Sequence, residues 1–269
     1  MTFPTHGYPL AAAVSPRLHV VDTVDSTNAK LLRDAADDPD GHPHLSVVLS
    51  RDQRAGRGRL DRTWTTPPGT ALAVSTLLRV GAVAVADRGW IPLVAGAAMT
   101  RAIARQLDGL SVGLKWPNDV LVAAGGAAGG TAGGGRKICG ILAEVLPSDP
   151  EAVVVGAGVN TAMTEAELPV PTATSFAVFG READEDRLLA DYLTGLRDGI
   201  ADLAVGGGDA VRESVEQLCT TIGADVRVSL PDGTELTGRG VRLDRDGRLV
   251  IVHEGVEAVV AAGDVVHVR

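Results

Sequence analysis

The sequence predicts an α+β main domain followed by a small β-barrel. Between residues 18 and 222, short apolar runs typical of strands alternate with segments whose apolar residues recur at helical spacing. From residue 223 the pattern changes to short alternating strands, separated by pairs such as Asp246-Gly247 that favour hairpin turns. With 269 residues, 45% of them hydrophobic, the chain can bury a sizeable core.

The elements of the main domain follow from local patterns. Strands are expected over residues 18–25, 45–50, 70–80, 112–116, 120–123, 138–145 and 152–159. Helices are expected over 26–36, 90–107, 184–203 and 211–221, and Asp25 or Ser26 can cap the first of them. The glycine- and alanine-rich stretch 123–136 predicts a mobile surface loop between two strands.

The tail contains Asp232-Gly233, Asp246-Gly247 and Glu254-Gly255, each between runs of alternating residues. We therefore expect the last 47 residues to form a small antiparallel barrel. The predicted organisation is an N-terminal extension (1–17), a main domain (18–222) and a barrel domain (223–269).

Composition limits the classes of function. The formal net charge of −9 disfavours a general nucleic-acid binder. The longest apolar stretch, 89–100, is too short to span a bilayer, and the first 17 residues lack the basic start of a secretory signal. We therefore predict a cytoplasmic protein with no membrane partner. Cys139 and Cys219 provide neither a disulfide framework nor a zinc site, and we expect both to be buried.

Lysine and asparagine are scarce in a chain that is rich in arginine and aspartate. The only lysines are Lys30, Lys115 and Lys137, and the only asparagines are Asn28, Asn118 and Asn160. Because Arg cannot replace Lys where a compact cation is needed, the surviving residues point to where chemistry takes place. Survival by chance is the alternative explanation.

An arginine-rich segment, expected to be a polar loop over residues 51–69, follows the second predicted strand. Five arginines lie within residues 51–62, interleaved with Gly56 and Gly58. Glycine lets the backbone approach a ligand closely, and guanidinium groups can fork onto carboxylate or phosphate oxygens. A solvated basic loop is about as frequent an explanation, whereas the lack of interleaved aromatics disfavours a nucleic-acid patch.

Two further segments place a lysine beside a strand. Residues 115–119, Lys-Trp-Pro-Asn-Asp, end one strand in what could be an ordinary turn. Lys137 begins the next apolar run, and strict alternation puts it on one face with Cys139 and Ile141, while Gly140 leaves room for a close approach. A lysine that enters a core needs an anion, unless it extends from the strand end into solvent.

Common nucleotide and hydrolase motifs are missing. Residues 156–161 lack the third glycine of a dinucleotide fingerprint, and Ile138 stands where a P-loop requires Ser or Thr. No His or Asp has a defensible triad spacing to Ser26, and His42 and His44 are expected to be exposed loop residues.

Taken together and in this order, the segments resemble those of the biotin protein ligases. The resemblance rests on Ser26-Thr27-Asn28, QRAGRGR (53–59), Trp64, KWPND (115–119), KICGILAE (137–144) and GAGVN (156–160), and it spans residues 18–175. The tail matches that family's small C-terminal domain. The resemblance implies a central mixed β-sheet catalytic domain of the biotin/lipoate ligase type with a small C-terminal SH3-like β-barrel.

The resemblance also implies a two-step reaction. Biotin and ATP give biotinyl-5'-AMP and pyrophosphate, and a lysine of a biotin carboxyl carrier domain then takes the biotin. Lys137, Arg57 and Arg59, with Mg²⁺, would stabilise charge at the α-phosphorus. Biotin would contact Ser26, Thr27, Asn28, Gln53, Gly56, Arg57, Gly58, Arg59, Lys137 and Gly140. The nucleotide would contact Arg59, Arg62, Trp64, Asn118, Lys137, Gly158 and Asn160, and Asp119 is the candidate metal ligand.

Some members of the family carry an N-terminal DNA-binding domain, for which the roughly twenty residues before the first strand are too few. We therefore expect a monofunctional enzyme that does not bind DNA, and homodimerisation stays open. The arginine-rich loop is expected to be mobile without ligand. The Gly/Ala insertion before Lys137 is longer than the family's usual connection. Such an insertion is tolerated because the entropic cost of closing a loop grows only slowly with its length. A lipoate ligase of similar fold and a biotin or adenylate sensor without turnover are the competing hypotheses.

Overall fold

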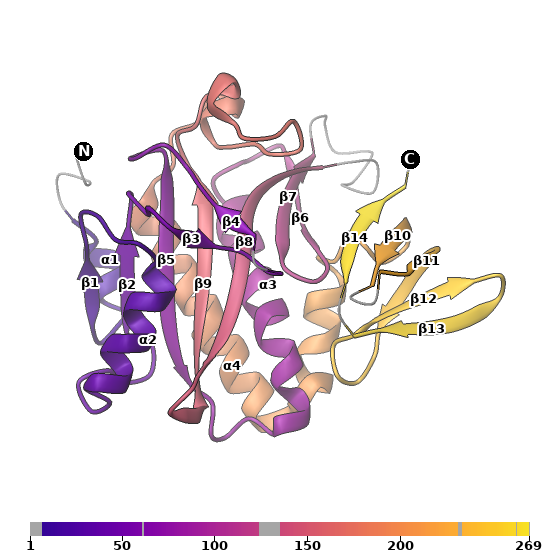
Figure 1. Cartoon of the computed structure of the whole chain (residues 1–269), viewed down its shortest axis with the longest axis horizontal. Coiled ribbons are helices and arrows are strands. Elements are labelled where there is room, and N and C mark those ends of the chain that lie inside the picture. The colour runs from indigo at the N-terminus through magenta and orange to yellow at the C-terminus, as the bar shows by residue number, and fades with distance from the viewer. Residues whose placement is uncertain (1–6, 61, 124–134, 231–232, 262, 269) are drawn as a thin grey trace.

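The main β-sheet of the computed structural model is a mixed sheet of seven strands (Figure 1). Their order is β1 (Leu18–Val20), β2 (Val47–Ser50), β5 (Ala71–Arg79), β9 (Asp149–Asn160), β8 (Arg136–Leu146), β7 (Asp119–Ala123) and β6 (Ser111–Lys115). Only β1 and β2 are parallel among these neighbours. The structure describes residues 7–60, 62–123, 135–230, 233–261 and 263–268, so the predicted loop at 123–136 lies almost entirely outside the described residues.

Helices cover both faces of this sheet. Along β2, Val47 and Leu49 join the larger apolar core, whereas Val48 joins a smaller cluster with Leu31 of α2 (Thr27–Asp37). Because successive strand residues point to opposite faces, α2 covers one face and the larger core lies on the other. There α3 (Ile91–Ala104) and α4 (Glu185–Glu216) pack against each other, and α3 contacts β6, β7 and β8.

Short elements complete the main domain. They are α1 (Pro9–Ala12) and the 3₁₀ segments η1 (Val85–Trp90), η3 (Glu165–Glu167) and η4 (Ala177–Phe179). In the described part of the chain, no helix combines the length and apolar content that crossing a membrane requires. Cys139 and Cys219 are both buried thiols, as predicted.

Two sequence-based boundaries need correction. The strand expected over 18–25 ends at Val20, because Thr23 instead donates its hydroxyl to Asp52 and only an isolated bridge joins Val24 to Gln53. The two helices expected over 184–203 and 211–221 form one long element, interrupted at Gly207 (φ 63°, ψ −161°). Glycine adopts this conformation without the Cβ clash that other residues meet.

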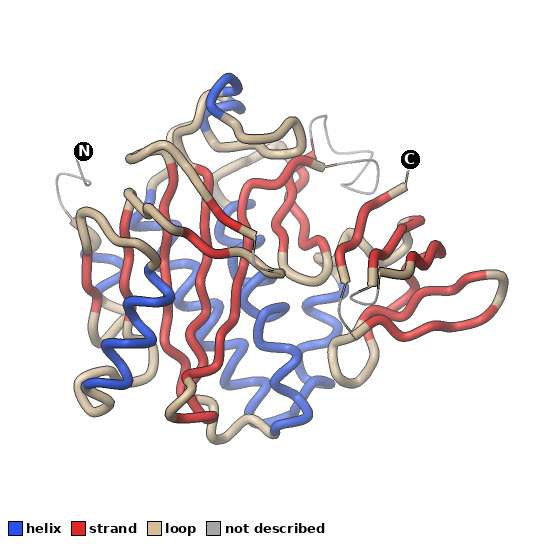
Figure 2. Tube along the Cα trace, viewed as in Figure 1, coloured by secondary structure: helices blue, strands red, loops and turns tan. Residues whose placement is uncertain are grey.

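The C-terminal residues form a separate five-stranded antiparallel sheet (Figure 2). Its order is β13 (Val256–Val260), β12 (Leu249–His253), β11 (Glu235–Leu243), β10 (Asp225–Ser229) and β14 (Asp264–His267). The predicted turns at 246–247 and 254–255 connect β11 to β12 and β12 to β13, whereas Asp232 of the first predicted turn lies outside the described residues. This antiparallel sheet is consistent with an SH3-like domain.

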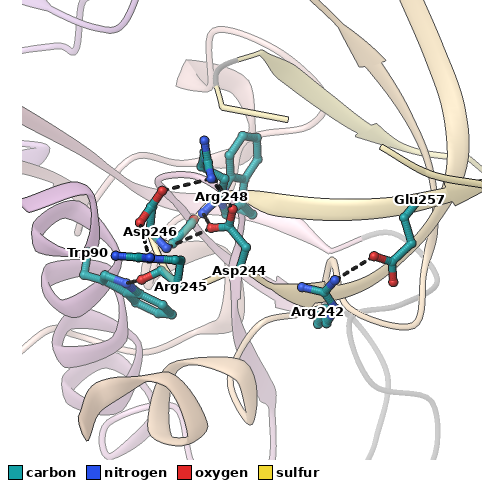
Figure 3. A network of polar contacts seen from close by, with 9 residues as sticks. Trp90, Arg242, Asp244, Arg245, Asp246, Arg248 and Glu257 are labelled. Carbon is teal, nitrogen blue, oxygen red and sulfur yellow. Dashed lines mark hydrogen bonds and ion pairs between the residues drawn. The ribbon is translucent and has the colours of Figure 1, made fainter. Parts of the chain in front are cut away.

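Hydrogen bonds from two tryptophans join the β11–β12 turn to the main domain. Trp90 donates its indole N–H to the carbonyl of Arg245 at 2.8 Å, and Trp116 donates to that of Gly247 at 3.1 Å. Within the turn, the Asp244 carboxylate accepts from the backbone and side chain of Arg248 (Figure 3). These hydrogen bonds fix the turn against the main domain. The C-terminal sheet therefore lies beside β6, the edge strand of the main sheet (Figure 1).

Candidate active site

The arginine-rich segment 51–69 is not a plain loop as predicted, because it contains a small hairpin. β3 (Gly56–Arg57) and β4 (Thr63–Trp64) pair antiparallel, and Gly58 donates its N–H to the Arg62 carbonyl at 2.6 Å. Gly56 is required here, since a Cβ at this position would lie 2.3 Å from the Trp64 carbonyl. The hairpin lies across one face of the main sheet, against Gly158 of β9, and carries the arginine side chains there (Figure 1).

A cavity between this hairpin and strands β7, β8 and β9 collects most of the predicted site residues. Those that line it are Ser26, Thr27, Asn28, Gln53, Arg57, Gly58, Arg59, Arg62, Trp64, Asn118, Asp119, Lys137, Gly140 and Gly158. Gly56 and Asn160 are not among its lining residues. Asn160 is buried and donates its side-chain amide to the Thr174 carbonyl at 2.8 Å, so it supports the segment beyond the cavity.

One end of the cavity is a buried network of uncharged polar groups. Ser26 caps α2, and Thr27 donates its backbone N–H and its hydroxyl to Gln53 Oε1 at 2.8 and 3.1 Å. Ser75 of β5 is hydrogen-bonded through its hydroxyl to Thr27 Oγ1 and Asn28 Oδ1, at 2.8 and 2.5 Å. Such donors and acceptors, themselves oriented by partners, can hold a neutral polar ligand group in a fixed orientation.

Asn28 connects this network to the first cation of the hairpin. Its side-chain amide donates to Glu144 Oε2 at 2.8 Å, and the same oxygen accepts from Arg57 Nη2 at 2.9 Å. A Cβ at Gly156 would lie 2.3 Å from Asn28 Oδ1, so glycine on β9 makes room for the amide. Arg57 is therefore oriented by a carboxylate on β8 while half its side chain stays exposed.

Lys137 lies on a different face from the one predicted. The register of β7 against β8 shifts, so that Val120 pairs with Cys139 and Leu121 with Lys137, and the intervening Ile138 is buried. This bulge brings the ammonium over Gly140, where a Cβ would lie 2.9 Å from Nζ. Strict alternation with Cys139 and Ile141 was thus wrong, and the space that Gly140 leaves is occupied by Lys137 itself.

Asp119, the candidate metal ligand, pairs with this lysine. Its Oδ1 lies 2.6 Å from Lys137 Nζ. Among the described residues, no group of three or more His, Cys, Asp and Glu side chains is arranged to hold a metal ion. Mg²⁺ commonly binds through one or two carboxylates together with substrate phosphates. Asp119, already paired with a lysine, therefore fits a metal that arrives with a nucleotide better than a resident metal.

Arg59 differs from the other cavity cations in its partners. It donates to the Asn118 amide oxygen at 3.2 Å and to the Gly263 carbonyl at 3.3 Å, both uncharged. Burial lowers the pKa of its guanidinium, which nevertheless stays protonated at neutral pH. A half-buried cation whose hydrogen bonds go to neutral groups attracts an anion, so this side chain is well suited to a phosphate or carboxylate.

The C-terminal sheet also contributes to the cavity. Asp264 of β14 lines it and forms an ion pair with Arg62. Trp64 packs its indole against the backbone of β9, since a Cβ at Gly158 would lie 2.7 Å from Cζ2 of the ring. Trp64 thus lines the cavity together with Arg59 and Arg62, a combination of an aromatic ring and cations that suits a nucleotide.

Three side chains that pair with predicted site residues were not themselves predicted. Ser75 and Asp264 stand in otherwise ordinary strand sequences, and only tertiary structure brings Ser75 to the Thr27 network and Asp264 to the cavity. Glu144 is the last residue of the segment KICGILAE (137–144). Its charge within an otherwise apolar strand is the signal that could have identified it as a site residue. Chemically, the cavity combines a neutral polar end with a cluster of cations, which suits transfer at an anionic centre next to a polar ligand.

Comparison with known proteins agrees with this arrangement. Residues 20–160 match the Biotin/lipoate A/B protein ligase family. The biotin--[acetyl-CoA-carboxylase] ligase of Mycobacterium tuberculosis is 36% identical over 258 residues, covering 94% of this chain and 90% of that protein. The bifunctional ligase/repressor BirA of Escherichia coli is 29% identical over 241 residues, covering 88% and 70%.

The fold is similar to that of a solved structure. The biotin protein ligase from Aquifex aeolicus in complex with biotin and ATP has a TM-score of 0.74 and 22% identity, covering 94% of this chain and 99% of that one. The family match over more than half the chain and the identity to a full-length relative lead to one conclusion. The chain belongs to the Biotin/lipoate A/B protein ligase family.

Proposed function

We propose that this protein is an ATP-dependent ligase that activates biotin to biotinyl-5'-AMP and transfers it to a lysine of a biotin carboxyl carrier domain. The observation that carries the proposal is the shared cavity of the Thr27–Gln53 network and the cations Arg57, Arg59 and Lys137. The neutral network suits the uncharged ureido ring of biotin, and the cations suit its carboxylate and the ATP phosphates.

In the first step, a biotin carboxylate oxygen forms a bond to the α-phosphorus of ATP while the bond to the β-phosphate oxygen breaks. Pyrophosphate leaves, and a mixed anhydride remains. Negative charge grows on the α-phosphate oxygens, so preorganised cations at Arg59 and Lys137 lower the barrier. Mg²⁺ would arrive with ATP and neutralise phosphate charge, and Asp119 would be the candidate carboxylate to hold it.

In the second step, the acceptor lysine attacks the carbonyl carbon of the anhydride as a neutral amine. The new amide bond forms, AMP leaves with the electron pair of the broken bond, and the amine nitrogen loses a proton. No covalent bond to this protein is required. The hairpin over the cavity protects the anhydride by limiting the access of water.

Several further aspects stay predictions. They are the division into 1–17, 18–222 and 223–269, the individual ligand roles of the cavity residues, a cytoplasmic location, the lack of DNA binding, and the assembly state, for which a homodimer is open. Loss of mobility in the arginine-rich loop on ligand binding also belongs to this group.

A transfer assay tests the proposal. The purified protein is incubated with biotin, MgATP and a biotin carboxyl carrier domain, and the carrier is analysed by intact mass. We expect the mass to rise by one biotinyl group, and a carrier whose target lysine is replaced by arginine should stay unmodified. Lys137→Ala should abolish the transfer. A carrier that stays unmodified despite measurable biotin binding would refute ligation and favour the sensor.

A further inference from the structure

The two ends of the arginine-rich segment are joined at one point on the main domain. Gly69 donates its N–H to the Arg51 carbonyl at 2.7 Å, and Arg51 Nη2 donates back to the Gly69 carbonyl at 2.7 Å. Two hydrogen bonds thus close residues 51–69 into a loop with adjacent ends. Every hairpin residue that lines the cavity lies between these two ends. The geometry of the base therefore contributes to the position of the hairpin, together with the hydrogen bonds from the N–H groups of Arg54 and Ala55 to the carbonyls of Val24 and Asp25.

Glu185, the first residue of α4, lies at this base although it is distant in sequence. Its Oε1 is 3.3 Å from Arg51 Nε, and the two side chains are 6% and 18% exposed. Low exposure removes most of the competition from water, so the interaction is stronger than a surface ion pair. The carboxylate holds the guanidinium at the angle from which Nη2 reaches the Gly69 carbonyl.

The second oxygen of this carboxylate is also occupied. The hydroxyl of Tyr8, just before α1, donates to Glu185 Oε2 at 2.9 Å, and the tyrosine is buried. Burial and the neighbouring carboxylate raise the pKa of the Tyr8 phenol well above its ordinary value, so it stays a hydrogen-bond donor at all physiological pH values. Glu185 is therefore held from both sides.

The adjacent carboxylate makes different contacts. Asp186 accepts from the backbone N–H groups of Leu10 and Ala11, at 3.0 and 2.9 Å. Through these bonds it fixes α1 to α4, whereas Glu185 contacts the loop base. Both acids lie in the first turn of α4, where a negative charge interacts equally well with the helix dipole. Substituting Glu185 and Asp186 one at a time therefore separates an effect on the loop base from an effect on the start of α4.

We propose that Glu185 is a positioning residue for the ligase site, acting through Arg51 and the Gly69 carbonyl to fix the base of the arginine-rich loop. The inference rests on the proposed function for its effect on biotin. Glu185 acts from outside the cavity, since neither Arg51 nor Glu185 lines it. Its consequence is that the N-terminal residues and α4 stabilise the hairpin that carries Arg57 and Arg59.

The test compares Glu185→Gln with Asp186→Asn by limited trypsin digestion and by the KM for biotin in pyrophosphate exchange. Trypsin cleaves after the loop arginines when the loop opens. For Glu185→Gln we expect initial cleavage after Arg57 and Arg59 to accelerate about tenfold, as when local opening becomes about 1.4 kcal/mol easier. The KM for biotin should also rise about tenfold, while Asp186→Asn keeps both values within about twofold.

A double variant provides a second test, because it shows whether the effects of Arg51 and Glu185 are coupled. If Glu185 acts through Arg51, the double variant Arg51→Gln/Glu185→Gln should be no worse than the worse single variant, in cleavage and in KM. Additive effects would overturn the proposal, as would equal effects of Glu185→Gln and Asp186→Asn. If Glu185→Gln does not fold, Arg51→Lys keeps the charge opposite Glu185 but cannot also reach Gly69, and it should accelerate cleavage in the same way.

The digestion also separates this inference from the proposed function. A wild-type protein without biotin-dependent exchange would refute the ligase, yet the cleavage comparison would still test the loop base. Conversely, normal exchange with unchanged cleavage in Glu185→Gln would refute the positioning role and leave the ligase intact.

Discussion

The substitution Gly140→Ala should impair adenylation selectively while leaving the fold intact. The Cβ that alanine adds would lie 2.9 Å from Lys137 Nζ and 3.0 Å from its Cε, where ordinary contacts begin near 3.4 Å. The ammonium must therefore move by about half an ångström or more. It is the tip of a flexible side chain with 39% exposure, so it can swing toward solvent rather than distort the strand.

The displacement separates Lys137 from Asp119 and from the position where charge develops. Losing a half-exposed ion pair costs at most about 1 kcal/mol of folding free energy. Misplacing a catalytic group by about 1 Å can cost up to about 100-fold in rate. We therefore expect the rate of biotin-dependent pyrophosphate exchange to fall by about 10- to 100-fold, with a melting temperature only a few degrees lower.

A matched control is Gly81→Ala, at the opposite end of the main sheet. There the added Cβ would lie 2.8 Å from Oε2 of Glu151, again the tip of an exposed side chain, so a similar local adjustment takes place far from the cavity. This control should exchange at the wild-type rate. If Gly140→Ala also exchanges within twofold of wild type while Lys137→Ala is inactive, the position of the ammonium over Gly140 is irrelevant and the reasoning fails.

Three further expectations follow from individual contacts. Trp116→Phe removes the donor to the buried Gly247 carbonyl and should cost about 1–3 kcal/mol in chemical denaturation; an unchanged midpoint would show that this bond does not hold the C-terminal sheet. Burial, with the charge of Lys115, lowers the pKa of His267 to about 4. The unfolded chain therefore binds the proton at a higher pH than the folded chain does, and stability should fall as the pH drops from about 6.5 to 4. Because solvent screens this partly exposed side chain, the loss should be about 1–2 kcal/mol, and His267→Gln should reduce it. Trp64→Ala should raise the KM for ATP about tenfold or more and that for biotin less, whereas equal increases would contradict its assignment to the nucleotide.

Much of the fold could be predicted because its signals are local. The apolar runs, the Ser26 cap and the Asp246-Gly247 turn each reflect neighbouring residues, and most elements lie where these patterns put them. The bulge at Ile138 could not be predicted by alternation, because it arises from how β7 pairs with β8. It decides which face Lys137 occupies, so the most important side chain of the site was predicted on the wrong face.

In the site, too, residues within local motifs could be predicted, and residues that only tertiary structure brings there could not. Motif residues such as Gln53 and Arg59 reach the cavity as expected, since the motifs themselves form its walls. Supporting residues come from distant parts of the chain: Asp264 from β14, and Glu185 from the start of α4. An isolated carboxylate in a strand or at a helix N-terminus has an ordinary structural explanation, and only the folded chain shows which cation it meets.

The most direct test of the account is pyrophosphate–ATP exchange by the purified protein with biotin, with lipoate or with neither. We expect exchange that requires both biotin and Mg²⁺, that does not occur with lipoate, and that disappears in Lys137→Ala. Exchange supported by lipoate and not by biotin would contradict the proposed substrate while leaving the family assignment in place. No exchange with either acid, although biotin binds, would contradict the central claim that this cavity activates a carboxylate with ATP.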